Sequence, residues 1–416
     1  MRRSGILCHI SSLPSPHGIG TFGKAAYDFV DFLIESKQSY WQILPLGPTS
    51  YGDSPYQTFS AFANNPYFID LDFLVEEKLL TQSDIKSKFE SPRYVDYHDL
   101  YDLRFDILKI AYHNFDQNNQ AYQAFLEKES YWVYDYALFM AIKVMYKGKS
   151  WLFWDEDIRQ RDEQTLAHYK ELLKEDIEFY QFLQYKSYQQ WMNLKAYANK
   201  HDIEIIGDMP IYVSYDSSDV WANPKMFDLD QERLPLHVAG VPPDNYALDG
   251  QLWGNPLYNW DVMEKDDFSW WIKRVQSSME LFDMIRIDHF IGFVNFFSIT
   301  YGDKTARNGV WQKGPGKKLF DVMKEQLGDV NIIAEDLGVL TDDVRKLVKD
   351  TGFPGMKLLQ FAFDSREESD YIPYLYPKNV IAYTGTHDNQ TTASWFDFIG
   401  DDDLKYCLDY INHQGD

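Results

Sequence analysis

Cysteine and long apolar runs are both scarce in this 416-residue chain. Cys8 and Cys407 are the only cysteines, too few for a disulfide framework and without the spacing of a metal site. The first residues include two arginines but only a short apolar run, so they lack the core of a secretion signal. No later stretch approaches the roughly 18 consecutive apolar residues that span a bilayer. We therefore expect a soluble, cytoplasmic protein with no membrane partner.

Positive charge is also in short supply. The chain has 40 Lys and Arg against 64 Asp and Glu, a formal net charge of −24. Such a surface repels nucleic acid and other phosphate polymers, so a neutral substrate fits it better. The GxGxxG and GxxxxGK[ST] loops of nucleotide binders are absent as well. We expect no cofactor and no nucleic-acid partner.

Aromatic residues, by contrast, are abundant. They make up 17% of the chain, with 30 Tyr, 28 Phe and 12 Trp. Flat rings stack well on the apolar faces of sugars, which favours a carbohydrate substrate. The alternative is a tyrosine-rich but otherwise ordinary interior.

Short apolar runs that end in glycine, proline or charged residues alternate with amphipathic stretches. This alternation predicts parallel strands joined by helices. Seven candidate strands cover residues 5–9, 40–44, 203–208, 284–288, 331–335, 356–361 and 380–384. Predicted helices include residues 24–36, 268–282, 317–327 and 341–351.

Polar residues follow strand after strand, which favours a (β/α)8 TIM-type barrel over a doubly wound sheet. Residues 1–50 hold the first two strands, and residues 51–200 form an inserted, mostly helical subdomain. Residues 201–416 hold strands three to seven, with a long substrate loop at 209–260. No eighth strand follows, so the barrel is predicted to lack its last β/α unit.

Three acidic residues follow three different predicted strands: Asp288, Glu335 and Asp388. Asp288 and Glu335 are one strand-helix unit apart, so adjacent strands would bring their carboxyl groups to the roughly 5 to 5.5 Å of a retaining glycosidase. Arg286, two residues before Asp288 on the same side of a strand, would keep it ionised as a nucleophile. Burial and like charge would raise the pKa of Glu335, as a general acid requires. Asp388, preceded by His387, would stay ionised and hold substrate hydroxyls.

Two other interpretations of these residues stay open. Each acidic residue alone could be a strand-end cap or a surface ion pair. Alternatively, four of these side chains together with His9 and Asp208 could bind a divalent metal, although there is no His-x-His pair and Arg286 would oppose a cation. Our prediction is that no metal is bound; the six are His9, Asp208, Asp288, Glu335, His387 and Asp388.

Further sugar contacts are expected on loops. The segment Tyr51-Gly-Asp-Ser-Pro-Tyr-Gln57 offers Tyr51, Ser54 and Tyr56, and the long loop offers Trp253. Packing or turn formation would explain any one of them, but as a group on loops they favour binding.

These residues lie in motifs that resemble the 4-α-glucanotransferases known as amylomaltases or disproportionating enzymes, glycoside hydrolase family 77 of the α-amylase clan. The resemblance covers essentially the whole chain. It is carried by SGILCHISSLPSPHGIG, SYWQILPLGPTSYGDSPYQTFSAFANNPYFIDL, GDMPIYV, AGVPPD, GQLWGNPLY, RIDHF, AEDLG and GTHDN.

The resemblance implies a nucleophile at Asp288, a general acid/base at Glu335 and a transition-state stabiliser at Asp388. It also places Arg286 and His387 beside the sugar at the cleavage point. The remaining residues that it implies are Asp208 at the third strand end and Tyr56 and Trp253 along the donor groove.

The implied reaction transfers a segment of an α-1,4-glucan from a maltodextrin to the 4-hydroxyl of another glucan or glucose, with retention of configuration. Maltooligosaccharides and glucose are then the partners, and we expect a monomer. The family's chain continues through a final strand-helix unit that is missing here. This departure leaves an α-glucan hydrolase, or an inactive glucan-binding fragment, as alternatives.

Overall fold

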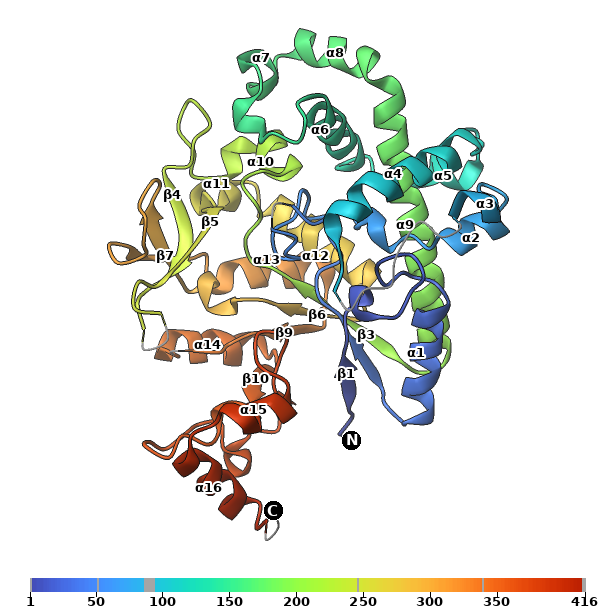
Figure 1. Cartoon of the computed structure of the whole chain (residues 1–416). Helices are drawn as coiled ribbons and strands as arrows, with labels where there is room; N and C mark the ends of the chain where they lie inside the picture. The colour runs from blue at the N-terminus through green and yellow to red at the C-terminus, as the bar shows by residue number, and fades with distance from the viewer. Residues whose placement is uncertain (1, 51, 86–93, 245–246, 339, 414–416) are drawn as a thin grey trace.

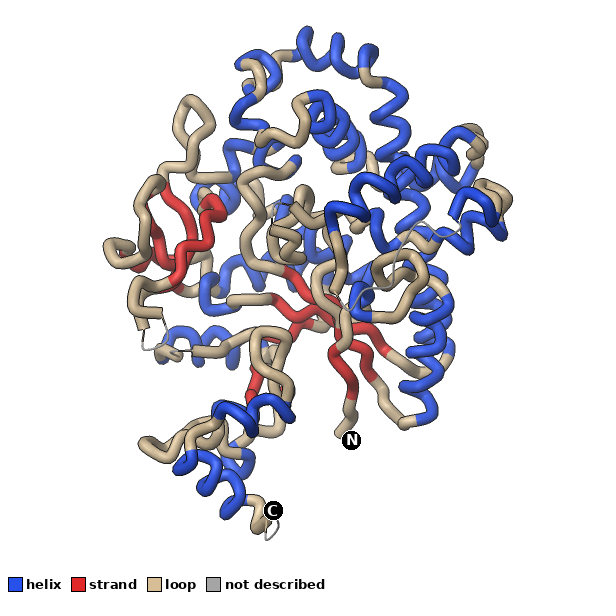
Figure 2. Tube along the Cα trace, in the orientation of Figure 1, coloured by secondary structure: helices blue, strands red, loops and turns tan. Residues whose placement is uncertain are grey.

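The computed structural model describes residues 2–50, 52–85, 94–244, 247–338 and 340–413. Its centre is a parallel sheet with the strand order β1-β2-β3-β6-β9 (Figure 2). These strands coincide with the first five predicted strands, which confirms the α/β class. Their bounds are β1 (Gly5–Leu7), β2 (Tyr40–Gln42), β3 (Glu204–Met209), β6 (Met284–Ile287) and β9 (Ile332–Ala334).

Two more parallel strands, β10 (Gly355–Leu358) and β11 (Val380–Tyr383), pair with each other at the predicted sixth and seventh positions. The Ala334 N–H donates to the Pro354 carbonyl at 2.9 Å, which sets β9 beside β10. The Tyr383 hydroxyl reaches Gln42 Oε1 of β2 at 2.8 Å, so the strands form a curved strip. Within the described ranges β1 and β11 each pair on one side only, and closure into a barrel stays a prediction.

Helices connect most of the consecutive parallel strands, as predicted. The connection after β9 shows how local sequence defines such a helix. The Thr341 hydroxyl caps its first turn, and the negative charges of two aspartates in that turn interact favourably with the positive end of the helix dipole. Gly352 ends the helix in a left-handed conformation with φ of 73°. The connecting helices are α1 (Lys24–Glu35), α12 (Ser269–Leu281), α13 (Lys317–Leu327) and α14 (Asp342–Thr351).

The connection between β2 and β3 is mostly helical and lies above the sheet in Figure 1. Its longest helix, α9, packs against both α6 and α1 and so ties this layer to the sheet. The helices are α2 (Leu71–Glu76), α3 (Gln82–Ile85), α4 (Tyr97–His113), α5 (Gln120–Lys128), α6 (Val133–Met145), α7 (Glu156–Arg159), α8 (Glu163–Leu172) and α9 (Lys174–Lys200).

Much of the aromatic surplus lies in the interior. Rings of the helical layer pack edge to face, as Phe115 does with Tyr122 and Tyr112 with Phe179. The ordinary-interior interpretation therefore holds for many of these rings. Five tryptophans are among the largest fully buried side chains: Trp41, Trp151, Trp191, Trp221 and Trp271.

A second, antiparallel sheet with the order β5-β4-β7-β8 was not predicted. Its first two strands lie in 209–260, which the sequence predicted to be mostly irregular, together with α10 (Ser218–Ala222). Glycine and proline weaken the strand signal there. Gly240 is required, because a Cβ on it would lie 2.1 Å from the Gln251 carbonyl oxygen. The strands are β4 (His237–Val241), β5 (Gln251–Pro256), β7 (Asn295–Thr300) and β8 (Val310–Lys313).

The remaining helices are α11 (Trp260–Lys265), α15 (Thr392–Phe398) and α16 (Asp401–Tyr410). The last two lie with β10 and β11 on the side of the sheet away from the helical layer (Figure 1). Within the described ranges, no helix has the length and apolar character needed to cross a bilayer.

Candidate active site

A buried ion-pair network joins the carboxyl ends of β3 and β6. Arg286 Nη1 donates to both carboxylate oxygens of Asp208 at 2.8 Å, and Nη2 donates to Asp288 Oδ1 at 2.7 Å. Asp208 and Arg286 are register partners on adjacent strands, which explains this geometry. The side chains of Asp208 and Arg286 are 0% and 2% exposed, whereas that of Asp288 is 30% exposed. Arg286 therefore anchors the one of these two carboxylates that solvent can reach.

Glu335 follows β9, the neighbour of β6 in the sheet. Its Oε2 accepts the His289 N–H at 2.7 Å and its Oε1 accepts the Leu337 N–H at 2.8 Å, so both oxygens are fixed by the backbone. Burial raises the pKa of Glu335 to about 7, with a further contribution from the negative charge of Asp288. Arg286 and the two N–H groups act in the opposite direction.

Burial also raises the pKa of Asp288, to about 6, and the neighbouring carboxylates of Asp208 and Asp388 add to the shift. The direct bond from Arg286 opposes it. The shared proton of the pair is therefore held preferentially by Glu335, because Arg286 bonds directly to Asp288. The bond from Arg286 thus favours the ionised form of Asp288, whereas burial favours the protonated form of Glu335.

Tyr56 links this network to the segment after β11. Its hydroxyl donates to Asp208 Oδ2 at 2.6 Å and lies 2.6 Å from His387 Nε2. Because a phenol has one proton and the carboxylate only accepts, we assign the second hydrogen bond to a donating His387 Nε2–H. The Tyr56 and His387 rings are stacked, with centroids 5.3 Å apart. His387 Nε2 is also 3.3 Å from Asp388 Oδ1, on a side chain that is 70% exposed.

The other predicted sugar contacts are placed less directly. Ser54 Oγ accepts the Tyr56 N–H at 3.3 Å and so stabilises the turn before Tyr56. Trp253 lies on β5, perpendicular to the His289 ring at 4.9 Å. Tyr51 lies outside the described residues.

Sequence reasoning missed the part played by His289. Its main-chain N–H holds Glu335, and its φ of 52° lies in the left-handed region that non-glycine residues seldom adopt. The only available signal was its position directly after Asp288. His9, weighed as a metal ligand, is buried after β1, and its Nδ1 accepts the Leu44 N–H at 3.2 Å.

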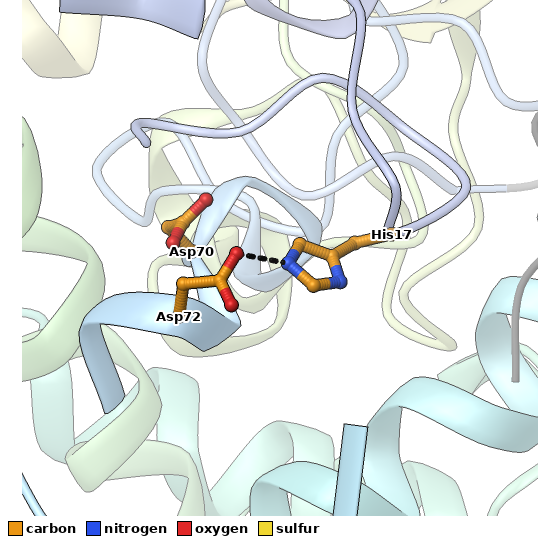
Figure 3. Close-up of side chains that lie close together, drawn as sticks. All are labelled: His17, Asp70 and Asp72. Atoms are coloured by element: carbon orange, nitrogen blue, oxygen red, sulfur yellow. Dashed lines mark hydrogen bonds and ion pairs between the residues drawn. The ribbon is translucent and has the colours of Figure 1, made fainter. Parts of the chain in front are cut away.

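Among the described residues, the group of possible metal ligands whose atoms lie within 4.8 Å of one another is His17, Asp70 and Asp72 (Figure 3). His17 Nε2 pairs with Asp72 Oδ2 at 2.9 Å. Asp70 accepts from the Thr21 hydroxyl and caps α2. The buried Arg104, which donates to the His17 carbonyl, opposes a cation beside them. These contacts tie the loop after β1 to α2.

Comparison with known proteins shows the family of the chain. The family model of 4-alpha-glucanotransferase, glycoside hydrolase family 77, matches residues 8–416. The 4-alpha-glucanotransferase of Clostridium butyricum is 52% identical over 401 residues, 95% of this chain and 82% of the relative. That of Thermus thermophilus is 48% identical, over 95% of this chain and 80% of the relative.

A solved structure has nearly the same fold. The amylomaltase from Streptococcus agalactiae in complex with acarbose superposes with a TM-score of 0.97 at 46% identity, over 100% of this chain and 85% of that one. The family model and the C. butyricum relative both match nearly the whole chain. The chain therefore belongs to glycoside hydrolase family 77 and is a 4-alpha-glucanotransferase.

Proposed function

We propose that the transfer proceeds by double displacement through Asp288 and Glu335. The Asp288 carboxylate attacks the anomeric carbon of an α-1,4-linked glucose while Glu335 gives its proton to the leaving 4-oxygen. The released glucan or glucose leaves a glycosyl ester on Asp288. Glu335 then takes the proton from the 4-hydroxyl of an acceptor glucan, whose oxygen displaces Asp288. The observation that carries the proposal is the guanidinium bridge between Asp208 and Asp288 beside a backbone-held Glu335.

The remaining groups take supporting roles in this proposal. Asp388, with its exposed carboxylate, and His387 bind sugar hydroxyls at the cleavage point, and Asp388 stabilises the transition state. Tyr56 and Trp253 line the donor groove, and Tyr51 and Ser54 contribute further sugar contacts. Both oxygens of Asp208 are occupied by Arg286 and Tyr56, so we propose that it acts through Arg286 and not by touching the sugar.

We also propose the finer architecture and the setting. The curved strip forms most of a (β/α)8 barrel, with residues 1–50 and 201–416 in the barrel and 51–200 as the inserted subdomain. The substrates are maltooligosaccharides and glucose, and the enzyme works as a cytoplasmic monomer without a cofactor or metal. The position of the candidate site at the carboxyl ends of the strands supports the barrel, because TIM barrels carry their active sites there.

Product analysis tests the proposed reaction. Incubation with maltotriose, without metal or nucleotide, should give glucose together with glucans longer than the substrate. Separation of the products by length over time measures this. Maltose and glucose alone would instead establish the α-glucan hydrolase, because water would then be the acceptor. Binding of maltodextrin without turnover would establish the inactive glucan-binding form.

The pH dependence of kcat/KM tests the assignment of the acid and the nucleophile. Asp288 must lose its proton and Glu335 must keep its own, and their pKa values are raised to about 6 and about 7. The profile should therefore rise as pH approaches 6, peak between about 6 and 7, and fall above 7. Initial rates with maltotriose in buffers of constant ionic strength measure it. A profile that stays flat from about pH 4 to 9 would contradict both assignments.

A further inference from the structure

The residue after the nucleophile has an unusual backbone. His289 has φ of 52° and ψ of 47°, a left-handed conformation, and it is followed directly by the short helix η5 (Phe290–Phe293). Residues other than glycine seldom adopt this conformation because the Cβ atom is crowded by the backbone, although asparagine, aspartate and histidine adopt it more often than the others. Strain of this kind persists where the surrounding structure enforces it, and it clusters at functional sites.

The turn at His289 directs two successive main-chain N–H groups at one residue. The His289 N–H donates to Glu335 Oε2 at 2.7 Å, and the Phe290 N–H donates to the Glu335 carbonyl at 3.0 Å. In return, the Glu335 N–H donates to the Ile287 carbonyl at 3.1 Å. The nucleophile and the acid/base are thus joined through the backbone, and the first of these bonds depends on the orientation of the His289 peptide plane.

The imidazole of His289 is held by packing. The ring lies perpendicular to Trp253 of β5, with centroids 4.9 Å apart. On another side Gly292 leaves room for it, because a Cβ there would lie 3.1 Å from His289 Cδ2. The ring is buried, and its Nε2 has no hydrogen-bond partner within the described part of the chain. Packing between Trp253 and Gly292 therefore fixes the position of the ring.

We infer that His289 is a positioning residue for Glu335: its left-handed backbone turn aims a main-chain N–H at the acid/base carboxylate, and the packing of its ring supports that turn. This inference rests on the proposed role of Glu335 and extends it. An N–H that bonds to a carboxylate stabilises its charged form. Loss of the bond should therefore raise the pKa of Glu335, move the alkaline limb of kcat/KM to higher pH, and lower kcat through misplacement of the acid.

Other charged groups also act on Glu335 and must be kept constant. Arg286 and Asp288 interact with it from the end of β6, and the Tyr371 phenol interacts with it from the segment before η7 (Pro373–Leu375). Replacement of His289 changes none of these side chains. The His289 imidazole itself stays neutral above about pH 4, because burial lowers its pKa to about 4, so its own titration does not contribute near pH 7.

A graded series of substitutions tests the inference: His289→Asn, His289→Ala and His289→Val. Asparagine tolerates the left-handed conformation, alanine disfavours it, and the β-branched valine resists it most strongly. We expect the alkaline pKa of kcat/KM to stay near the wild-type value in His289→Asn and to rise by about half a unit in His289→Ala. It should rise further in His289→Val, where kcat should fall about 100-fold. If the valine variant does not fold, the comparison of asparagine with alanine decides the question.

Asp202 provides the matched control. It is exposed, has φ of 60°, and precedes β3 at the end of the sheet opposite the site. Asp202→Val should lower the thermal midpoint but leave the alkaline limb in place. The inference is overturned if His289→Ala and His289→Val lose stability as Asp202→Val does, yet keep the wild-type limb and kcat. It is also overturned if His289→Asn moves the limb as far as His289→Ala does.

A separate variant distinguishes failure of the proposed function. The pH profile of kcat/KM for Glu335→Gln should lack the alkaline limb that the wild-type enzyme shows, because no acid remains to titrate. If Glu335→Gln keeps that limb, the role of Glu335 is wrong and the inference about His289 fails with it. If Glu335→Gln removes the limb but the His289 series leaves it unmoved, the inference alone fails.

Discussion

Asp288→Asn is expected to abolish glucan transfer, lowering kcat/KM for maltotriose by about 10⁴-fold or more. An amide cannot form the glycosyl ester on which the double displacement depends. The fold should survive, because Arg286 Nη2 can still donate to the amide oxygen that replaces Asp288 Oδ1. Product separation after incubation with maltotriose measures the loss, and circular dichroism checks the fold.

The covalent intermediate itself can be observed. The fluoride ion of a maltosyl fluoride leaves with little help from an acid, so Glu335→Gln should still form the glycosyl ester with this substrate. The variant should then transfer or hydrolyse the ester only slowly. Intact-protein mass spectrometry should then show a maltosyl adduct, and peptide mapping should place it on Asp288. The double variant Asp288→Asn with Glu335→Gln should show no adduct. An adduct on another residue would refute the assignment.

Asp283 is the matched control for the nucleophile. It lies at the other end of the same strand, directly before β6, where its carboxylate accepts the Ile205 N–H at 2.8 Å. Asp283→Asn should cost some stability and leave transfer within about threefold of wild type, because it is far from the carboxyl end of the strand. A loss equal to that of Asp288→Asn would mean that the activity follows stability and not the nucleophile.

The parallel strands and their acidic ends could be predicted from the sequence because both follow simple rules. Apolar runs separated by amphipathic helices predict a parallel sheet, and carboxyl ends of neighbouring strands meet at one edge. Asp288 and Glu335 were expected on adjacent strands, and β6 pairs with β9 in the structure. The two-residue spacing of Arg286 and Asp288 also predicted one common side, and their hydrogen bond confirms it.

Other features depend on three-dimensional context that a pattern does not encode. The left-handed turn at His289 contains no glycine that would predict it from the sequence. The His289 N–H reaches Glu335 only because two strands are adjacent. The antiparallel sheet was missed because glycine in a sequence usually indicates a loop. Gly240 instead lies within a strand, where it permits a close approach of two backbones. The hydrogen bonds that Arg286 and Tyr56 donate to the Asp208 carboxylate likewise join residues that are far apart in the sequence.

Asp208→Ala is expected to have the second largest effect, and it acts on both stability and activity. Removal of one member of a buried ion pair leaves an uncompensated charge, which typically costs about 3 to 5 kcal/mol of unfolding free energy. Arg286 would keep only Asp288 as a carboxylate partner, and Tyr56 would lose its acceptor. Denaturant unfolding measures the free energy of unfolding, and initial rates measure the change in activity.

The division of the effect between kcat and KM tells how Asp208 acts. If it positions Arg286, kcat should fall about 100-fold or more with little change in KM, because the interaction lost is one that orients the nucleophile. A raised KM with unchanged kcat would instead mean that the Asp208 carboxylate contacts the bound sugar.

A double-mutant cycle with Arg286→Ala separates positioning from direct contact, because coupled residues are strongly non-additive. If Asp208 works through Arg286, the loss of Arg286 already removes its effect, and Asp208→Ala should cost little more in that background. The two variants should move the acidic limb of kcat/KM in opposite directions. Arg286 lowers the pKa of Asp288, so Arg286→Ala should move the limb to higher pH, whereas Asp208→Ala removes a carboxylate that raises this pKa and should move the limb to lower pH.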